Sequence, residues 1–222
     1  MKKKVLFLPL FCLLIAACVI APDLRSCAAQ TETVSSASDG LLFSITTFDG
    51  KSESEPFVKC LGHTWLSLEN QTGHSVFLKE QELRPGESVT FSVWAISDHY
   101  GVVFNLEPAF IRDFGRYAGR ESLSVGICES QLGVIEDYID SNDRWTLGKN
   151  CSYWSVQLWN AVVEKTYRLE MKTLVYTPKK LRKSLREFSA SETDMDFPCA
   201  GGIWFYQNGQ KTELELCSGK TE

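Results

Sequence analysis

The chain has 222 residues, enough for one domain and a targeting segment, and carries a formal net charge of −5. Residues 1–29 hold four basic residues against one acidic residue, a net charge of +3, so residues 30–222 carry −8. An acidic domain argues against nucleic acid as the partner, because phosphate backbones select basic surfaces.

The first 21 residues have the pattern of a secretory signal: the lysines of residues 2–4 precede an apolar run over residues 5–21. A retained membrane helix is the alternative, although this run barely spans a bilayer core of about 30 Å. The segment IAAC (15–18) resembles a bacterial lipobox, which would leave a lipid-modified Cys18, whereas ordinary cleavage would fall near residues 28–29. Each route predicts an extracytoplasmic domain, secreted or anchored to the outer face of the membrane, with membrane contact only through the N-terminal segment.

Residues 30–40 are small and polar and predict a flexible linker. From residue 41 to 127, short segments rich in β-branched and aromatic residues alternate with turn residues, which predicts strands. The predicted strands are LLFSITTF (41–48), FVKCL (57–61), HTWLSLEN (63–70), SVFLK (75–79), SVTFSVWAI (88–96), VVFNL (102–106) and SLSVGI (122–127).

Three predicted helices follow the strands. Apolar residues at helical spacing between 132 and 139 predict the first helix, with Ser130 as its N-cap. The second runs from about Cys151 to Lys165, and the third begins at Thr177–Pro178, with Thr as N-cap and Pro in the first turn. Strands first and helices later predict an α+β domain with a central antiparallel sheet and packed helices.

Eight cysteines divide between the targeting region and the mature domain. The five in the mature domain are Cys60, Cys128, Cys151, Cys199 and Cys217. In an oxidising compartment, an odd number leaves at least one thiol without a partner in the chain. Cys199 and Cys217 flank a predicted hairpin whose turn is Asn208-Gly209, so we expect these two to form a disulfide. Cys60–Cys128 is then the remaining pair, and Cys151 is left as the free thiol.

Cys151 begins the second predicted helix and lies on the same face as Trp154, Leu158 and Val162, which we expect to pack on the sheet. In the first turn, the unpaired amides and the positive end of the helix dipole favour the thiolate, the nucleophilic form. Asn150 is expected to cap the helix, and the amide of Cys151 points to where an oxyanion would form. The position predicts a nucleophile; a buried structural cysteine is the alternative.

A thiolate nucleophile requires an imidazole partner, and the chain has three histidines. His63 begins a predicted strand whose alternate residues share one face, so its ring is expected to project toward the helix of Cys151. His74 lies in a polar turn, and His99 precedes the strand VVFNL. Scattered histidines without a C-x-x-C pair indicate no metal site, and no pattern indicates a cofactor.

The motifs GHTWLSLEN (62–70) and NCSYWSVQLWNAV (150–162) resemble the circularly permuted branch of the NlpC/P60 superfamily of papain-like cysteine peptidases and amidases. This branch includes the lecithin:retinol acyltransferase-like proteins, and the pattern is most similar to secreted bacterial members. The resemblance covers about residues 41–188. It implies a papain-like fold, Cys151 as nucleophile, His63 as base and a peptide or peptidoglycan-like substrate.

The family also has a third polar residue that orients the imidazole, and three residues compete for this role: His99, His74 and Glu69. We favour His99, because the segment HYGVVFNLE (99–107) resembles a feature of these proteins.

The predicted organisation has four regions. Residues 1–29 form the signal peptide or membrane anchor, 30–40 the linker, 41–190 the permuted NlpC/P60-like domain, and 191–222 a C-terminal hairpin extension. The predicted function is a secreted hydrolase that cleaves an amide bond, for example in cell-wall peptide. The alternatives are an acyltransferase or a thioester or lipid hydrolase on the same fold, which basic residues between 179 and 186 favour, and a non-catalytic secreted binding module.

Overall fold

The computed structural model describes residues 40–50, 62–96, 99–170 and 176–214. The predicted targeting segment, the linker up to residue 39, the strand at 57–61 and the cysteines Cys60 and Cys217 lie outside these ranges. Within them, no helix is both long enough and apolar enough to cross a membrane.

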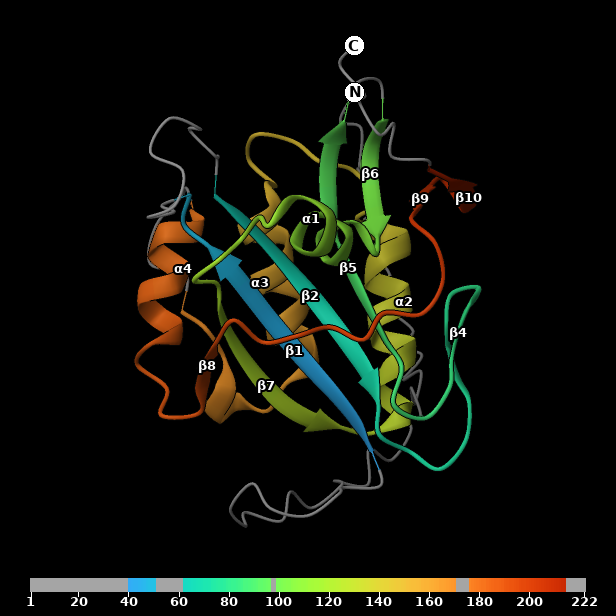
Figure 1. Cartoon of the computed structure of the whole chain (residues 1–222), viewed down its shortest axis with the longest axis horizontal. Helices are drawn as coiled ribbons and strands as arrows, with labels where there is room; N and C mark the ends of the chain where they lie inside the picture. Colours follow the sequence, from blue (N-terminus) through green and yellow to red (C-terminus); the bar gives the residue numbers. More distant parts are fainter. Residues whose placement is uncertain (1–39, 51–61, 97–98, 171–175, 215–222) are drawn as a thin grey trace, which may run out of the picture. The chain divides into compact units, whose positions relative to one another are not determined.

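A large antiparallel sheet forms the centre of the described ranges, with the strand order β10-β9-β6-β5-β2-β1-β7-β8 (Figure 1). Its strands are β1 (Leu41–Phe48), β2 (His63–Asn70), β5 (Ser88–Ile96), β6 (His99–Phe104), β7 (Glu121–Ile127), β8 (Ser191–Thr193), β9 (Trp204–Gln207) and β10 (Gln210–Glu213). A separate small hairpin is formed by β3 (Val76–Leu78) and β4 (Gln81–Leu83).

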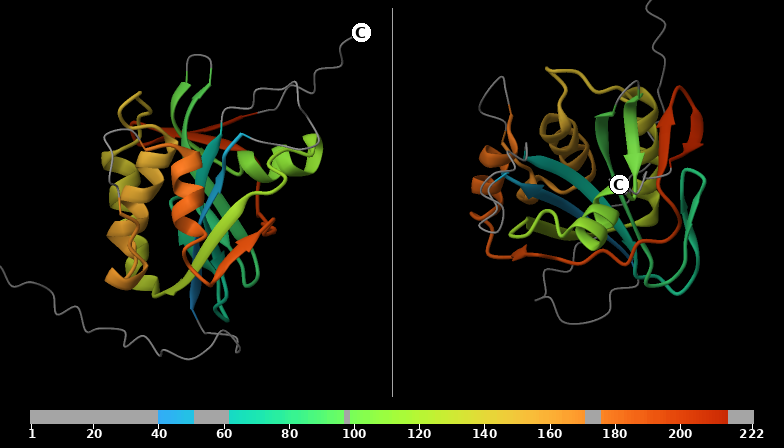
Figure 2. Two further views of the ribbon diagram at one scale, coloured as in Figure 1. Left: turned by 90° about the vertical axis from the view of Figure 1, so that its left-hand side faces the viewer. Right: turned by 45° about the horizontal axis from the view of Figure 1, so that its top comes forward.

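Helices cover both faces of this sheet (Figure 2). On one face lie α2 (Leu132–Ser141), α3 (Cys151–Val162) and α4 (Pro178–Leu185), and on the other lies α1 (Leu106–Phe114). Two short 3-10 helices, Glu129–Gln131 and Lys165–Tyr167, precede α2 and follow α3. The chain is therefore an α+β protein with a large antiparallel sheet, which confirms the predicted class.

The main core lies between the sheet and the helices α2, α3 and α4. Trp154 and Leu158 of α3 are fully buried, and Trp159 stacks on Phe43 of β1 with ring centroids 5.4 Å apart. Burial of each such side chain contributes about 1.5–3 kcal/mol, and this hydrophobic gain fixes α3 on the sheet. The predicted packing of the apolar face of this helix is confirmed.

Several element ends differ from the prediction because of contacts that the sequence does not display. Ser130 does not cap α2: a 3-10 turn precedes this helix, and the Gln131 side chain accepts a hydrogen bond from the Cys128 amide at 2.8 Å. The same side chain donates to the Val162 carbonyl at 2.5 Å, which ties the start of α2 to the end of α3. That helix ends at Val162 rather than at Lys165.

The C-terminal segment contributes a strand or strands to each edge of the sheet. β8 pairs with β7 at one edge and β9 with β6 at the other, so residues 194–203 cross the face on which α1 lies (Figure 1). Asn208-Gly209 forms the turn of the β9–β10 hairpin, as predicted, with both residues at positive φ. The segment that the sequence set apart as an extension is thus built into the sheet.

Candidate active site

Cys151 is the first residue of α3, and Asn150 is its N-cap. The Asn150 Oδ1 accepts a hydrogen bond from the Tyr153 amide at 3.0 Å, and its Nδ2 donates to the Tyr176 carbonyl at 3.0 Å. The predicted cap is confirmed. Both ends of the Asn150 amide are engaged in these bonds, so an oxyanion at Cys151 would be met by backbone amides rather than by this side chain.

The His63 ring reaches Cys151, as predicted, although it does not lie on the face of the sheet that carries α3. The ring lies on the opposite face, 5.7 Å from the ring of Trp65, whereas Thr64 faces α3. Backbone pairing between β2 and β5 extends only from Leu66 to Glu69, so the first residues of β2 diverge from β5 (Figure 1). The β2 edge at His63 is therefore not covered by β5. The imidazole hydrogen-bonds the Cys151 thiol past this uncovered edge.

Glu107 holds the His63 ring from the other side. The His63 Nε2 lies 2.8 Å from Oε1 of Glu107, which leaves Nδ1 for Cys151. His63 is 5 % exposed and Glu107 is 0 % exposed. A carboxylate at this depth fixes the orientation of the imidazole and stabilises its protonated form.

Two further side chains donate hydrogen bonds to Glu107. The Thr90 hydroxyl donates to Oε2 at 2.9 Å, and the Trp94 indole Nε1 donates to Oε1 at 3.0 Å. Glu107 stands in the first turn of α1, which begins directly after Asn105, a residue at φ 60°. Asn105 anchors this turn by donating to the Ala200 carbonyl at 2.6 Å. The carboxylate is thus positioned by β5 and by the segment that crosses the sheet.

The electrostatics of the site favour an ion pair between thiolate and imidazolium. Burial raises the pKa of the Cys151 thiol, but the charge of His63, its hydrogen bond and the backbone of Thr64 and Ser152 together lower the pKa below its ordinary value. Burial lowers the pKa of His63, but Cys151 and Glu107 outweigh it and raise this pKa to about 9. His63 is therefore protonated at neutral pH, and the lowered pKa of Cys151 favours its thiolate, the nucleophilic form.

A chain of buried hydroxyl groups attaches the start of α3 to the sheet. The Ser152 Oγ lies 2.8 Å from Oγ1 of Thr64, which in turn lies 3.0 Å from Oγ1 of Thr47 on β1. The Thr47 hydroxyl also donates to the carbonyl of Pro178, at the start of α4, at 3.3 Å. These bonds fix the position of the first turn of α3, and so of Cys151, relative to β2.

The three residues proposed to orient the imidazole differ in position. Glu69 lies six residues along β2 from His63, about 20 Å away, and His74 forms an exposed pair with Glu129 at 3.0 Å. The His99 backbone pairs with Ile96 at the start of β6, and its side chain lies outside the description. Glu107, which the sequence reasoning missed, contacts the imidazole, although it ends the very segment HYGVVFNLE.

No disulfide forms among the described cysteines, Cys128, Cys151 and Cys199. The expected pairs Cys199–Cys217 and Cys60–Cys128 each include a residue outside the described ranges. The Cys199 thiol lies 3.5 Å from the Ser88 hydroxyl, and burial raises its pKa to about 11.

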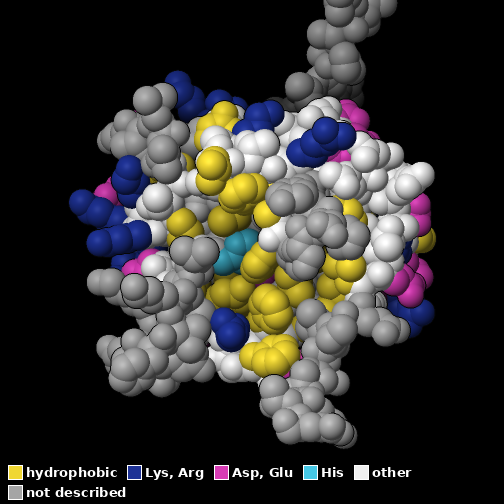
Figure 3. All heavy atoms as spheres, turned by 90° about the horizontal axis from the view of Figure 1, so that it is seen from above, with side chains coloured by type: hydrophobic (Ala, Val, Ile, Leu, Met, Phe, Trp, Pro, Cys, Tyr) yellow, Lys and Arg dark blue, Asp and Glu magenta, His cyan; other side chains and the backbone are white. Residues whose placement is uncertain are grey.

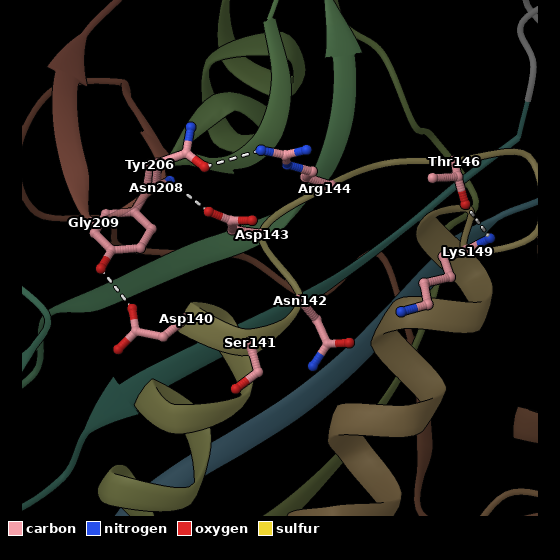
Figure 4. A pocket seen from close by; sticks show the side chains of 10 residues that line it. All are labelled: Asp140, Ser141, Asn142, Asp143, Arg144, Thr146, Lys149, Tyr206, Asn208 and Gly209. Carbon is pink, nitrogen blue, oxygen red and sulfur yellow. Dashed lines mark hydrogen bonds between the residues drawn. The ribbon is translucent and has the colours of Figure 1, made fainter.

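A polar cavity of about 680 Å³ lies beside the segment that leads into Cys151 (Figure 4). Lys149 is among its lining residues, and three hydrogen bonds join the end of α2 and the loop after it to the β9–β10 hairpin. The Tyr206 hydroxyl donates to Asp140 at 2.5 Å, the Asn208 amide donates to Asp143, and Arg144 donates to the Asn208 side chain at 3.1 Å. The hairpin thus supports the loop that leads into Cys151.

The basic helix α4 uses part of its charge within the molecule. Arg182 pairs with Asp49 at 2.8 Å and donates to the Gly119 carbonyl, and Arg186 pairs with Glu121. These bonds fasten α4 to β1 and β7, and they weaken the argument for a membrane-binding patch.

Comparisons of the chain with protein-family models, with curated proteins and with solved structures find no match.

Proposed function

We propose that this chain is a cysteine hydrolase that cleaves an amide bond, with Cys151 as nucleophile, His63 as acid and base, and Glu107 as the group that orients the imidazole. The observation that carries the proposal is the position of the buried His63 ring, which hydrogen-bonds Cys151 and places its Nε2 2.8 Å from the buried Glu107 carboxylate. A histidine strand that precedes a cysteine helix also fits the circularly permuted NlpC/P60 arrangement, and we extend the proposal to that papain-like fold.

In the proposed reaction, the Cys151 thiolate attacks the substrate carbonyl, and a carbon–sulfur bond forms. The His63 imidazolium donates its Nδ1 proton to the leaving nitrogen as the carbon–nitrogen bond breaks. The neutral imidazole then takes a proton from water, the resulting hydroxide attacks the thioester, and the thiolate leaves. The net change consumes one water, releases an acid and an amine, and restores the ion pair.

The amides of Cys151 and Ser152, the first two residues of α3, are the donors that we assign to the oxyanion. They have no acceptor within the helix, and the positive end of the helix dipole adds to their effect. The proposed substrate is a peptide or peptidoglycan-like amide outside the cytoplasm, as the N-terminal sequence pattern indicates, and no cofactor takes part.

Alkylation of the full chain by iodoacetamide, with mass spectrometry to assign each modified cysteine, tests the proposal. We expect the alkylation rate of Cys151 to change by less than about tenfold between pH 8 and pH 6, because the His63 imidazolium stabilises its thiolate, and Cys199 to stay unmodified. If the Cys151 rate instead rises about tenfold per pH unit up to pH 8, the ion pair does not exist and the proposal fails.

A further inference from the structure

A continuous series of aromatic rings leads from His63 to the surface along α1. The ring centroid of Trp94 lies 4.0 Å from that of His63 and 6.1 Å from that of Phe110. The Phe110 ring in turn lies 5.9 Å from the ring of Phe114, the last residue of α1. We call Trp94, Phe110 and Phe114 the aromatic ladder.

Exposure to solvent increases along the aromatic ladder. Trp94 and Phe110 are half-buried, and Phe114 is 50 % exposed. Trp65, which also contacts the His63 ring, is 0 % exposed and belongs to the core. Packing of the imidazole explains Trp65, whereas Phe114 packs on Phe110 with one side and leaves the rest of its ring open to solvent.

Three charged side chains near the aromatic ladder are either paired with each other or buried. Arg112 and Asp113, which precede Phe114, form an ion pair with each other at 2.7 Å, and Glu107 is buried beneath the ladder. Figure 3 looks down on this end of the molecule and shows hydrophobic side chains gathered around a histidine, with one basic side chain among them and most Lys and Arg side chains farther out. The surface next to the site therefore suits an uncharged, apolar group.

We propose that the aromatic ladder binds an apolar group of the substrate, an alkyl chain or an aromatic side chain, attached next to the carbonyl that Cys151 attacks. This inference rests on the proposed function and narrows its substrate class to amides that carry such a group. The continuity of the rings with the reacting imidazole is what selects a part of the substrate, rather than another protein, as the occupant. Each methylene that leaves water for this surface adds to the affinity.

A series of N-alkyl chloroacetamides with methyl, butyl and octyl groups tests the inference on the full chain. The Cys151 thiolate displaces chloride, so the second-order rate of alkylation reports binding of the alkyl group without any need for the natural substrate. We expect the rate to rise about twofold per methylene in the unmodified protein, since a partly exposed surface recovers only part of the transfer free energy. The N-methyl probe reports the thiolate alone.

The variant Phe114→Ser should lower the dependence on chain length by at least half and leave the N-methyl rate unchanged. Phe77→Ser is the matched control, because Phe77 is 57 % exposed and lies on β3, outside the aromatic ladder. It should retain the full dependence.

Each result decides a separate question. If all three probes react at the same rate and this rate exceeds that of an ordinary thiol, the inference is overturned and the proposed function stands. An N-methyl rate equal to that of an ordinary thiol overturns the proposed function. If the dependence of the alkylation rate on chain length persists in Phe114→Ser, the inference is overturned, because the alkyl group is then bound elsewhere. If this dependence falls equally in Phe77→Ser, the inference is also overturned, because the effect is then not specific to the aromatic ladder.

Discussion

Two half-buried thiols of this chain lie in contrasting surroundings. Cys151 has the His63 imidazolium and the backbone of a helix start around its sulfur, and its pKa is lowered. Cys199 has the hydroxyl of Ser88 beside it, and burial raises its pKa to about 11. Both thiols are partly withdrawn from water, so the difference arises from the charges and dipoles that replace the water.

The carboxylate of Glu107 acts on both thiols in opposite directions. It raises the pKa of His63 and so supports the positive charge that stabilises the Cys151 thiolate. At Cys199 the same negative charge adds to burial in raising the pKa. The same carboxylate thus contributes to the difference between the two thiols, although burial at Cys199 and the charge of His63 at Cys151 are the larger causes, and the variants below test that difference.

The largest effect is expected from removal of the nucleophile. Cys151→Ser should lower the hydrolysis of an acylated p-nitroanilide by at least about a thousandfold, because a serine hydroxyl stays protonated beside His63. Cys199→Ser should leave kcat/KM within about twofold of the parent. The release of p-nitroaniline measures both. Equal losses in the two variants would contradict the division of roles between the thiols.

His63→Ala should make Cys151 behave like Cys199. Without the imidazolium, burial dominates and the pKa of Cys151 rises above that of an ordinary thiol. We expect its alkylation by iodoacetamide at pH 6.5 to fall about a hundredfold. His74→Ala is the control, because His74 has a carboxylate partner at a similar distance but on the surface. A fall in that variant would show that loss of any histidine suffices.

Glu107→Gln keeps the shape of the side chain and removes its charge, so the two thiols should respond in opposite directions. The pKa of His63 should fall from about 9, and the alkaline limb of kcat/KM for the p-nitroanilide should move to lower pH by about one unit. The pKa of Cys151 should rise and that of Cys199 should fall, as measured by alkylation against pH.

The control for this change is Glu129→Gln, which removes the charge of an exposed His–Glu pair. It should leave both pKa values in place. An alkaline limb that stays near pH 9 in Glu107→Gln would remove Glu107 from the proposed mechanism.

Local patterns predicted those parts of the site that depend on neighbouring residues. β1, β2 and β5 have the predicted bounds, because their β-branched and aromatic runs end at turn residues. The cap of α3 by Asn150 and the start of α4 at Pro178 follow from side-chain chemistry within a single turn. The placement of Cys151 at a helix start was therefore legible in the sequence.

Contacts between distant segments were largely beyond such patterns. The contact between His63 and Cys151 was predicted correctly, but alternation along β2 does not show that pairing with β5 begins only at Leu66, which lets the ring reach Cys151 from the opposite face. Glu107 was missed because strand-like residues up to Leu106 concealed the left-handed turn at Asn105, at which α1 begins. A Pro two residues after Leu106 was the available signal, since Pro is tolerated in the first turn of a helix.

Trp94→Phe tests a smaller contribution to the same difference between the thiols. The variant keeps a ring against His63 but removes the indole hydrogen bond to Glu107. A bond to a charged acceptor contributes about 1.5–3 kcal/mol, and Glu107 retains two other partners, so we expect kcat to fall about threefold to tenfold. KM should stay constant for a substrate with a short acyl group. A change in KM alone for that substrate would mean that the hydrogen bond from Trp94 to Glu107 does not contribute to catalysis.

The smallest effect is expected where the C-terminal hairpin supports the loop before Cys151. Tyr206→Phe removes the hydroxyl that donates to Asp140 and leaves the ring in place. Loss of one hydrogen bond costs about 1 kcal/mol, which corresponds to a fall in Tm of about 2–4 °C for a protein of this size. Because Asn208 still holds the loop, the alkylation rate of Cys151 should change by less than about twofold. A fall of tenfold or more would mean that this hydrogen bond, and not the cap at Asn150, sets the position of the nucleophile.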